Sequence, residues 1–303
     1  MKLTTQITIL SQRLLIVLFA FMSFGTAQAQ SSYTYMVSYD QMNWEDDDNN
    51  ESDLKVYSAL MHLKPVKIRN HPIMEAAFLE RVSHAQIAIG YTDVTYGHPS
   101  IPDFDGTLYG GSFTYYSPSA PYAFNVLMLN TDLEPESPYS GKSEGDMFGF
   151  DVGYFLSKGH IIGLSYRQSK TDIDMPFLSV SNKITRDAYG LETKYVKKDA
   201  DNTAINLEGG FFILEYDDDT SSETNTLIDL EADYYLNPKT GLSFGIAFNN
   251  GDDKDNEGTI LSLGFHAFLS NNISVGLDYE SFDADDATGE DEEELGFNVR
   301  GWF

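Results

Sequence analysis

The chain has 303 residues, with 47 Asp and Glu against 19 Lys and Arg, which gives a formal net charge of −28. This acidity argues against a nucleic-acid partner, because binding to phosphates requires a basic face. The 19 Tyr and 20 Phe argue against disorder, and the lack of cysteine excludes a disulfide framework.

The first 29 residues have the features of a secretory signal peptide. Lys2 and Arg13 precede a short apolar run, and Ala27 and Ala29 provide the small residues of a cleavage site. The run of roughly a dozen apolar residues is too short to span a bilayer comfortably. We expect a cleaved signal peptide over 1–29, export through the periplasm, and one domain over 30–303.

The remainder alternates between apolar and polar side chains, as β-strands with two different faces do. In the segment 240–250, Leu242, Phe244, Ile246 and Phe248 share one face. The pattern predicts about 14 strands, with 12 to 16 possible. These strands are 33–43, 54–64, 84–96, 107–117, 121–132, 146–157, 160–169, 187–196, 203–214, 226–236, 240–250, 259–269, 272–280 and 294–303.

A soluble β-sandwich would show the same alternation, but three features favour a membrane barrel. The strands have the roughly 9–11 residues that cross a bilayer at a tilt, and short connections alternate with long ones. Aromatic residues gather at strand ends, as in the girdles of membrane barrels. These residues are Tyr115, Tyr116, Tyr122, Tyr195, Tyr234, Tyr235 and Trp302. We predict an all-β, transmembrane, antiparallel up-and-down β-barrel.

Connection length also predicts the orientation, because bacterial barrels have short periplasmic turns and longer outer loops. The predicted outer loops include "WEDDDNNESD", "EPESPYSGKSEGD", "EYDDDTSSETN", "NNGDDKDNEG" and "ESFDADDATGEDEEE". They are strongly acidic, whereas the predicted periplasmic turns carry more bases. We expect the loops to bind Ca²⁺ or Mg²⁺ diffusely beside outer-membrane lipid and lipopolysaccharide.

No specific metal site is predicted. "DDKDNEG" places Asp253, Asp255 and Glu257 at alternate positions, as a calcium loop does. The twelfth position of an EF-hand requires a bidentate Glu, and Gly264 stands there instead. The pattern therefore fails, and no cofactor is expected.

Residues 65–83 interrupt the alternation of the strands. Asn70 and Pro72 are typical of a helix start, and "IMEAAFLERV" has helical spacing. We expect a short periplasmic helix packed under or into the barrel. The alternative is a plug or a partner-binding element.

Two stretches carry a resemblance to a known family. The final strand alternates up to Phe303 and resembles the C-terminal signal that the barrel-assembly machinery of Gram-negative bacteria reads. "LMHLKPVKIR" followed by "NHPIMEAAFLERVS" resembles the putative general bacterial porins of gamma-proteobacteria. The resemblance implies an outer-membrane channel, and general porins are commonly homotrimers. It supplies no catalytic or ligand-binding residue.

If the apolar faces meet lipid, the opposite faces line the lumen. By alternation, these faces carry Asp151, Arg167, Glu192, Lys194, Glu208, Asp229, Glu231, Asp233, Asp278 and Arg300. The excess of acids predicts a pore that prefers cations, with Asp229, Glu231 and Asp233 as its selectivity element. The alternative is a closed lumen filled by salt-bridge ladders. Arg300 and Asp278 are expected to pair across neighbouring strands.

Catalysis is not predicted, because the six histidines are scattered and none has an evident Ser or Asp partner. A lipid-acting hydrolase is the weaker third interpretation, and loss of function on changing His266, which faces the lumen by alternation, would favour it. The chain is interpreted as a porin-like channel for passive diffusion of small solutes and cations. The alternative is a non-conducting outer-membrane barrel that acts as an adhesin or structural protein through its acidic loops.

Overall fold

The fourteen predicted strands are all present and form one closed antiparallel barrel. The structure, a computed structural model, describes residues 32–46, 50–68, 71–96, 102–176, 180–199, 202–218, 222–251, 258–270, 272–284 and 292–303. The predicted signal peptide and residues 252–257 of the calcium-like stretch lie outside this part. Among the described residues, no helix is long and apolar enough to cross a membrane.

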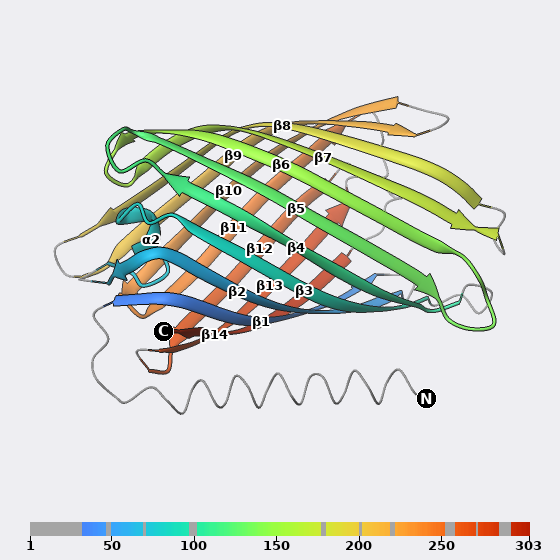
Figure 1. The fold of residues 1–303 in the computed structure, drawn as a ribbon, viewed down its shortest axis with the longest axis horizontal. Helices are drawn as coiled ribbons and strands as arrows, with labels where there is room; N and C mark the ends of the chain where they lie inside the picture. The colour runs from blue at the N-terminus through green and yellow to red at the C-terminus, as the bar shows by residue number, and fades with distance from the viewer. Residues whose placement is uncertain are drawn as a thin grey trace.

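The strands follow the chain order around the barrel (Figure 1). They are β1 (Ser32–Asp46), β2 (Glu51–Lys67), β3 (His84–Thr95), β4 (Phe104–Tyr116), β5 (Tyr122–Pro135), β6 (Lys142–Ser157), β7 (His160–Met175), β8 (Val180–Lys198), β9 (Ala204–Asp218), β10 (Ser222–Asn237), β11 (Thr240–Gly251), β12 (Gly258–Phe268), β13 (Ile273–Ala284) and β14 (Glu292–Trp302).

The first and last strands close the barrel. β1 pairs with β14 from Met36 opposite Trp302 to Asp46 opposite Glu292. Beyond this ladder, the backbone N–H of Phe303 donates to the carbonyl of Tyr35 at 2.8 Å, and the amide of Tyr35 donates back to Phe303 at 2.8 Å. Closure leaves no free sheet edge, so the backbone groups along the seam are paired without water.

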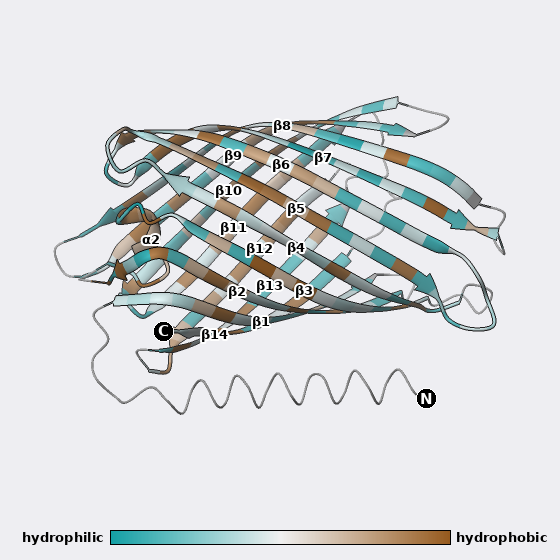
Figure 2. Cartoon of the chain, in the orientation of Figure 1, coloured by the Kyte–Doolittle hydropathy of each residue, from teal (hydrophilic) through white to brown (hydrophobic). Residues whose placement is uncertain are grey.

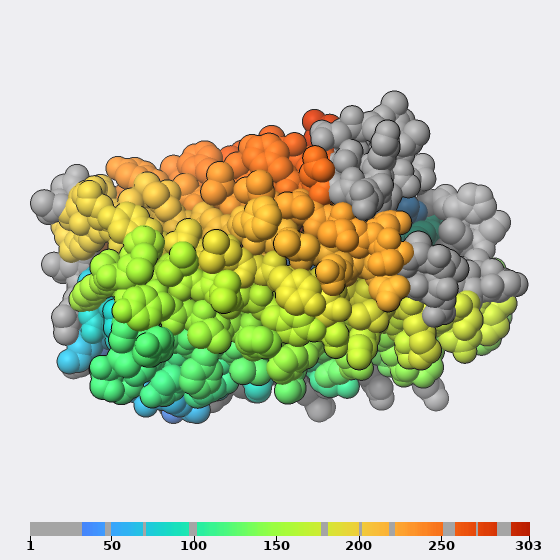
Figure 3. All heavy atoms as spheres, turned by 90° about the horizontal axis from the view of Figure 1, so that it is seen from above, coloured from blue at the N-terminus to red at the C-terminus, as the bar shows by residue number. Residues whose placement is uncertain are grey.

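The outside of the barrel carries an apolar belt. On β6, Phe148, Phe150, Val152, Tyr154 and Leu156 are all exposed and lie at alternate positions. Other strands contribute similar rows, and Figure 3 shows side chains of successive strands packed side by side over one face of the wall. A continuous wall of exposed apolar side chains is the surface that a barrel presents to lipid.

Several strands are longer than the sequence predicts, because they continue past the belt. β6 begins at Lys142 rather than at 146. β9 continues to Asp218 and β10 begins at Ser222, so both include residues of the predicted loop "EYDDDTSSETN". Much of the predicted outer loops "EPESPYSGKSEGD" and "EYDDDTSSETN" is therefore strand. Figure 2 shows hydrophilic residues along the strand ends away from α2. Bilayer thickness limits the apolar belt, but it does not limit the hydrogen-bonded ladder.

Three of the aromatic residues assigned to the girdles face the interior instead. Trp302 and Tyr235 have only 4% and 2% of their surface exposed, and Tyr116 lies on the interior face of β4. That part of the prediction was wrong, because all three side chains pack around a segment that enters the barrel. Tyr122 and Tyr234, at 56% and 44% exposed, do point outward.

This segment, residues 71–83 between β2 and β3, is called the plug segment here. Within its residues, all of which the structure describes, the plug segment has one helix, α2 (Ala76–Leu79). This helix is much shorter than the one expected over "IMEAAFLERV". The helix stops because Arg81, two residues beyond Leu79, adopts a positive φ of 49°. Figure 1 shows α2 at the end of the barrel that holds the C terminus.

The plug segment contacts strands on all sides of the barrel. Ile73, Ala76 and Val82 pack with Tyr33, Val66, Phe268 and Trp302, and thus against β1, β2, β12 and β14. Phe78 and Leu79 pack with Ala123, Phe155 and Val196 on β5, β6 and β8. The backbone N–H of Ile73 also donates to Pro238, in the β10–β11 turn, at 3.0 Å. These contacts place the segment in the barrel rather than beneath it, which agrees with the expected packing into the barrel and with the alternative of a plug.

Candidate functional site in the barrel interior

A buried ion cluster joins the plug segment to the barrel wall. Lys194 Nζ on β8 lies 2.9 Å from Glu75 Oε2 and 2.7 Å from Glu208 Oε1 on β9. The hydroxyl of Tyr235 on β10 donates to Glu75 Oε1 at 2.9 Å. The Glu75 side chain is only 7% exposed, and these partners offset the cost of burying its charge.

The cluster continues along the wall through Asn206. Its Nδ2 donates to Glu208 Oε1 at 2.7 Å and to Asp233 Oδ2 at 2.8 Å. The other oxygen of Asp233 accepts a hydrogen bond from Ser243. Glu75, Glu208 and Asp233 each offer an oxygen within 4.8 Å of the others, which is spacing suited to a cation. In this structure Lys194 binds two of the three.

A second charged group lies on β6 and β7. Arg167 donates to Asp151, and Asn125 Nδ2 on β5 donates to the other Asp151 oxygen at 2.9 Å. These contacts stay on the interior face and balance the Asp151 charge.

Arg300 does not pair with Asp278 as expected. The register places Ser274, not Asp278, opposite Arg300, and Asp278 accepts a hydrogen bond from Asn298 at 3.0 Å. Arg300 Nη2 instead lies 3.8 Å from Asp40 Oδ1 on β1. The prediction was wrong because barrel closure gives β14 a second neighbour, whose register the sequence does not reveal.

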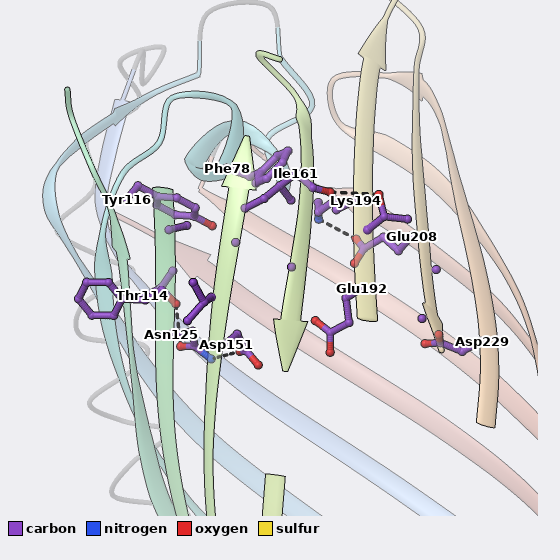
Figure 4. Close-up of a pocket in the computed structure, with 18 of the residues that line it drawn as sticks. Phe78, Thr114, Tyr116, Asn125, Asp151, Ile161, Glu192, Lys194, Glu208 and Asp229 are labelled. Carbon is purple, nitrogen blue, oxygen red and sulfur yellow. Dashed lines mark hydrogen bonds and ion pairs between the residues drawn. The ribbon is translucent and has the colours of Figure 1, made fainter. Parts of the chain in front are cut away.

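A cavity of about 440 Å³ opens beside these groups, between the plug segment and strands β4 to β10. Figure 4 shows Phe78 and Tyr116 at one end, and Asp151, Glu192, Lys194, Glu208 and Asp229 along the wall. Glycines 163 and 210 also line it and leave room for a solute. Four carboxylates and one amine therefore share a single chamber.

All ten charged residues that the sequence assigns to the interior lie on strand faces opposite the exposed apolar rows. The structure brings Lys194, Glu208 and Asp233 together with Glu75, and it places Asp151, Glu192 and Asp229 at the same cavity. Glu231 lies opposite Glu208 in the β9–β10 ladder. Asp278 and Arg300 lie on β13 and β14. Whether they line a conducting pore stays a prediction.

Sequence reasoning missed Glu75, Asp40 and Asn206. Asp40 shares a strand face with Ser38, and their two-residue spacing is the only signal that the sequence offers for it. Glu75 gave no signal, since its role depends on the plug segment entering the barrel. His266, considered as a catalytic candidate, packs its ring against Tyr235 with the ring centroids 5.4 Å apart.

His71 is a titratable group of the plug segment that lies outside the strands. Burial lowers the pKa of its imidazole below the ordinary value, and Lys158 and Lys198 act in the same direction. Its hydrogen bond to Glu80, at 3.3 Å, opposes that shift. The packed segment therefore favours neutral His71.

The sequence matches the family described as "Putative general bacterial porin" over residues 3–300. The chain belongs to this family. The porin is thus a β-barrel of the bacterial outer membrane, as its apolar belt and closed ladder require. No curated protein sequence matches it.

Solved structures share the fold of the porin at low sequence identity. The outer membrane protein Omp33 of Acinetobacter baumannii is 18% identical, with a TM-score of 0.62, over 90% of this chain and 99% of that one. The toluene transporter TbuX of Ralstonia pickettii is 9% identical, with a TM-score of 0.53, over 90% of each chain. At these identities the likeness shows the barrel fold alone.

Proposed function

We propose that the porin is a channel for passive diffusion of small solutes, with a preference for cations. The observation that supports this most directly is the charge of the interior cavity, where Asp151, Glu192, Glu208 and Asp229 face the single amine of Lys194. Fixed negative charge between low-dielectric walls raises the local concentration of cations and lowers that of anions.

Asp229, Glu231 and Asp233 on β10 are the proposed selectivity element. Asp233 is held by Asn206 and Ser243, whereas Glu231 faces Glu208 across the ladder. Like charges this close repel unless water or cations lie between them. The arrangement therefore favours a cation-filled passage over one crossed by anions.

The plug segment is the observation that favours the rival function, a non-conducting barrel acting as an adhesin or structural protein. Its contacts with β1, β2, β5, β6, β8, β12 and β14 narrow the lumen. In the channel reading, solutes pass beside the segment or when it moves. In the rival reading, the acidic outer ends of the strands carry the function.

Further parts of the proposal concern the surroundings of the barrel. The acidic outer loops would bind Ca²⁺ or Mg²⁺ diffusely and so approach anionic lipopolysaccharide without repulsion. Phe303, with its backbone held in the closing seam, would serve the barrel-assembly machinery as the recognition residue. A homotrimer is the proposed assembly, by analogy with general porins.

The proposed preference is tested by the reversal potential of the mature porin in a planar bilayer under a KCl gradient. We expect a potential that favours K⁺, and a smaller one in the variant D229N/E231Q/D233N. A control variant, D172N, removes a carboxylate that is 58% exposed and paired with Lys183 on the outer strand extensions. A preference for Cl⁻ would contradict the proposal.

A further inference from the structure

The cavity has a glycine in its wall that is flanked by two carboxylates. In the ladders, Gly210 on β9 lies directly opposite Glu192 of β8 on one side and Asp229 of β10 on the other. Gly210 has no side chain of its own, and the Phe212 ring and Asp229 Oδ1 occupy the place where its Cβ would lie. The part of the cavity wall over this ring, between the two acids, is called the slot here. Both acids and Gly210 line the cavity.

These two carboxylates lack the partners that the other acids of the cavity have. Asp151 is paired with Arg167 and Glu208 with Lys194, but within the described chain neither Glu192 nor Asp229 has a base within 4.0 Å. One oxygen of Asp229, Oδ1, is buried and makes no hydrogen bond to any described residue. A buried carboxylate oxygen without a partner is costly, so a donor that bound at Asp229 would offset that cost.

An aromatic ring lies beside the same slot. A Cβ at Gly190 would collide with the Phe212 ring at Cε1 and Cδ1, and a Cβ at Gly210 would collide with it at Cε2 and Cζ. The ring therefore spreads over both glycines, against the barrel wall. Phe212 lines the cavity. The same Cβ at Gly210 would collide with Asp229 Oδ1, so the ring and this carboxylate converge on the slot.

We propose that this slot binds a small organic cation, with its ammonium or guanidinium head between Asp229 and Glu192 and its hydrocarbon part against Phe212. Carboxylates satisfy the charge and the N–H donors of such a head, and an aromatic face attracts it as well. A hydrated inorganic ion would gain little from Phe212. Phe78, Tyr116 and Ile161 provide the apolar remainder of the chamber, whose volume of about 440 Å³ suits a small solute.

The inference rests on the proposed channel function in one respect, because it names the class of solute that the passage would favour. The binding measurement does not depend on conductance, so the binding site and the channel function can be contradicted separately. The test is isothermal titration calorimetry of the refolded mature porin in detergent micelles, with butylammonium as the probe. 1-Butanol, which has the same size and no charge, is the matched neutral solute.

We expect butylammonium to bind and 1-butanol not to bind. The variant D229N/E192Q should lose at least about tenfold in affinity, because charge-assisted hydrogen bonds are removed. Phe212→Leu should weaken binding by about 2- to 10-fold through the lost cation–π contact. Phe211→Leu is its control, since the neighbouring ring is exposed on the outer face.

The control for diffuse acidity is E280Q/E294Q. Glu280 and Glu294 are paired in the β13–β14 ladder, so this variant also removes two carboxylates, but neither lines the cavity. Its affinity should equal that of the wild type. An equal loss in this control, equal binding of 1-butanol, or no heat from butylammonium would each overturn the site. Binding by a porin that fails to conduct would support the site and contradict only the channel function.

Discussion

Lys194 is the residue on which the interior charges of the porin depend most. It is the only base within salt-bridge distance of Glu75 and of Glu208 in the described chain, and its ammonium lies 5.3 Å from the centroid of the Phe78 ring. It thus links β8, β9 and the plug segment at one point. Removing one member of a buried pair costs more than the pair contributes, because the remaining charge stays buried.

We predict that Lys194→Met destabilises the barrel. Glu208 is 39% exposed and water will screen part of the loss, so we expect about 1–2 kcal/mol rather than the full cost for a buried pair. The measurement is the temperature at which the folded barrel loses its fast mobility on a denaturing gel. Lys197→Met is the control, because Lys197 is 58% exposed and lies 3.7 Å from Asp199. An equal effect of both changes would contradict the prediction.

At the C terminus, deletion of Phe303 should reduce the amount of folded porin in the outer membrane several-fold. The residue closes the seam with Tyr35, and its ring is the predicted recognition feature. Phe303→Tyr keeps an aromatic end and should assemble normally. If the deletion variant assembles as well as the wild type, Phe303 is no assembly signal.

At the scale of elements, we predict that the plug segment limits how open the lumen is. Replacing residues 72–82 with a short Gly-Ser linker should raise single-channel conductance several-fold, because the contacts with Trp302, Phe155 and Val196 disappear. The cation preference should persist, since the strand carboxylates remain. Unchanged conductance would show that the segment does not limit the passage.

The plug segment should also loosen as the pH falls. His71 has a lowered pKa when packed, so it takes up a proton more readily once released, and acid favours release below about pH 6.5. The chain lacks cysteine, so Ala76→Cys, at a fully buried position, gives a single reporter. Maleimide labelling should be faster at pH 5.5 than at 7.0 after correction for thiolate content. His71→Gln should abolish the difference, and a persistent difference would assign it to another group.

The elements show what the sequence could and could not predict. Alternation located all fourteen strands, because one face must be apolar wherever a strand meets lipid. It could not locate the strand ends, as on β6, where the ladder continues through Lys142 to Asp146 beyond the last apolar residue. The plug contacts of Glu75 and Trp302 were also hidden, because they join segments whose proximity only the closed barrel creates.

For the whole molecule, the charge balance follows from the wall and the interior together. The belt fixes which faces meet lipid, and this leaves the acids on the remaining faces, where bases are fewer. The register then determines which acids are neutralised, as Arg167 does for Asp151, and which stay free, as at Asp229. Alternation predicted that the acids lie on the interior faces. Which of them are neutralised by a base could be learned only from the structure.

The central claim, that this barrel conducts, is tested most directly by single-channel recording of the mature wild-type porin in a planar bilayer with symmetrical KCl. The account predicts steady unitary currents, small because the plug segment narrows the lumen, which grow when residues 72–82 are replaced. A correctly folded barrel that stays silent, with and without the plug segment, would contradict the claim and leave the acidic outer surface as the functional part.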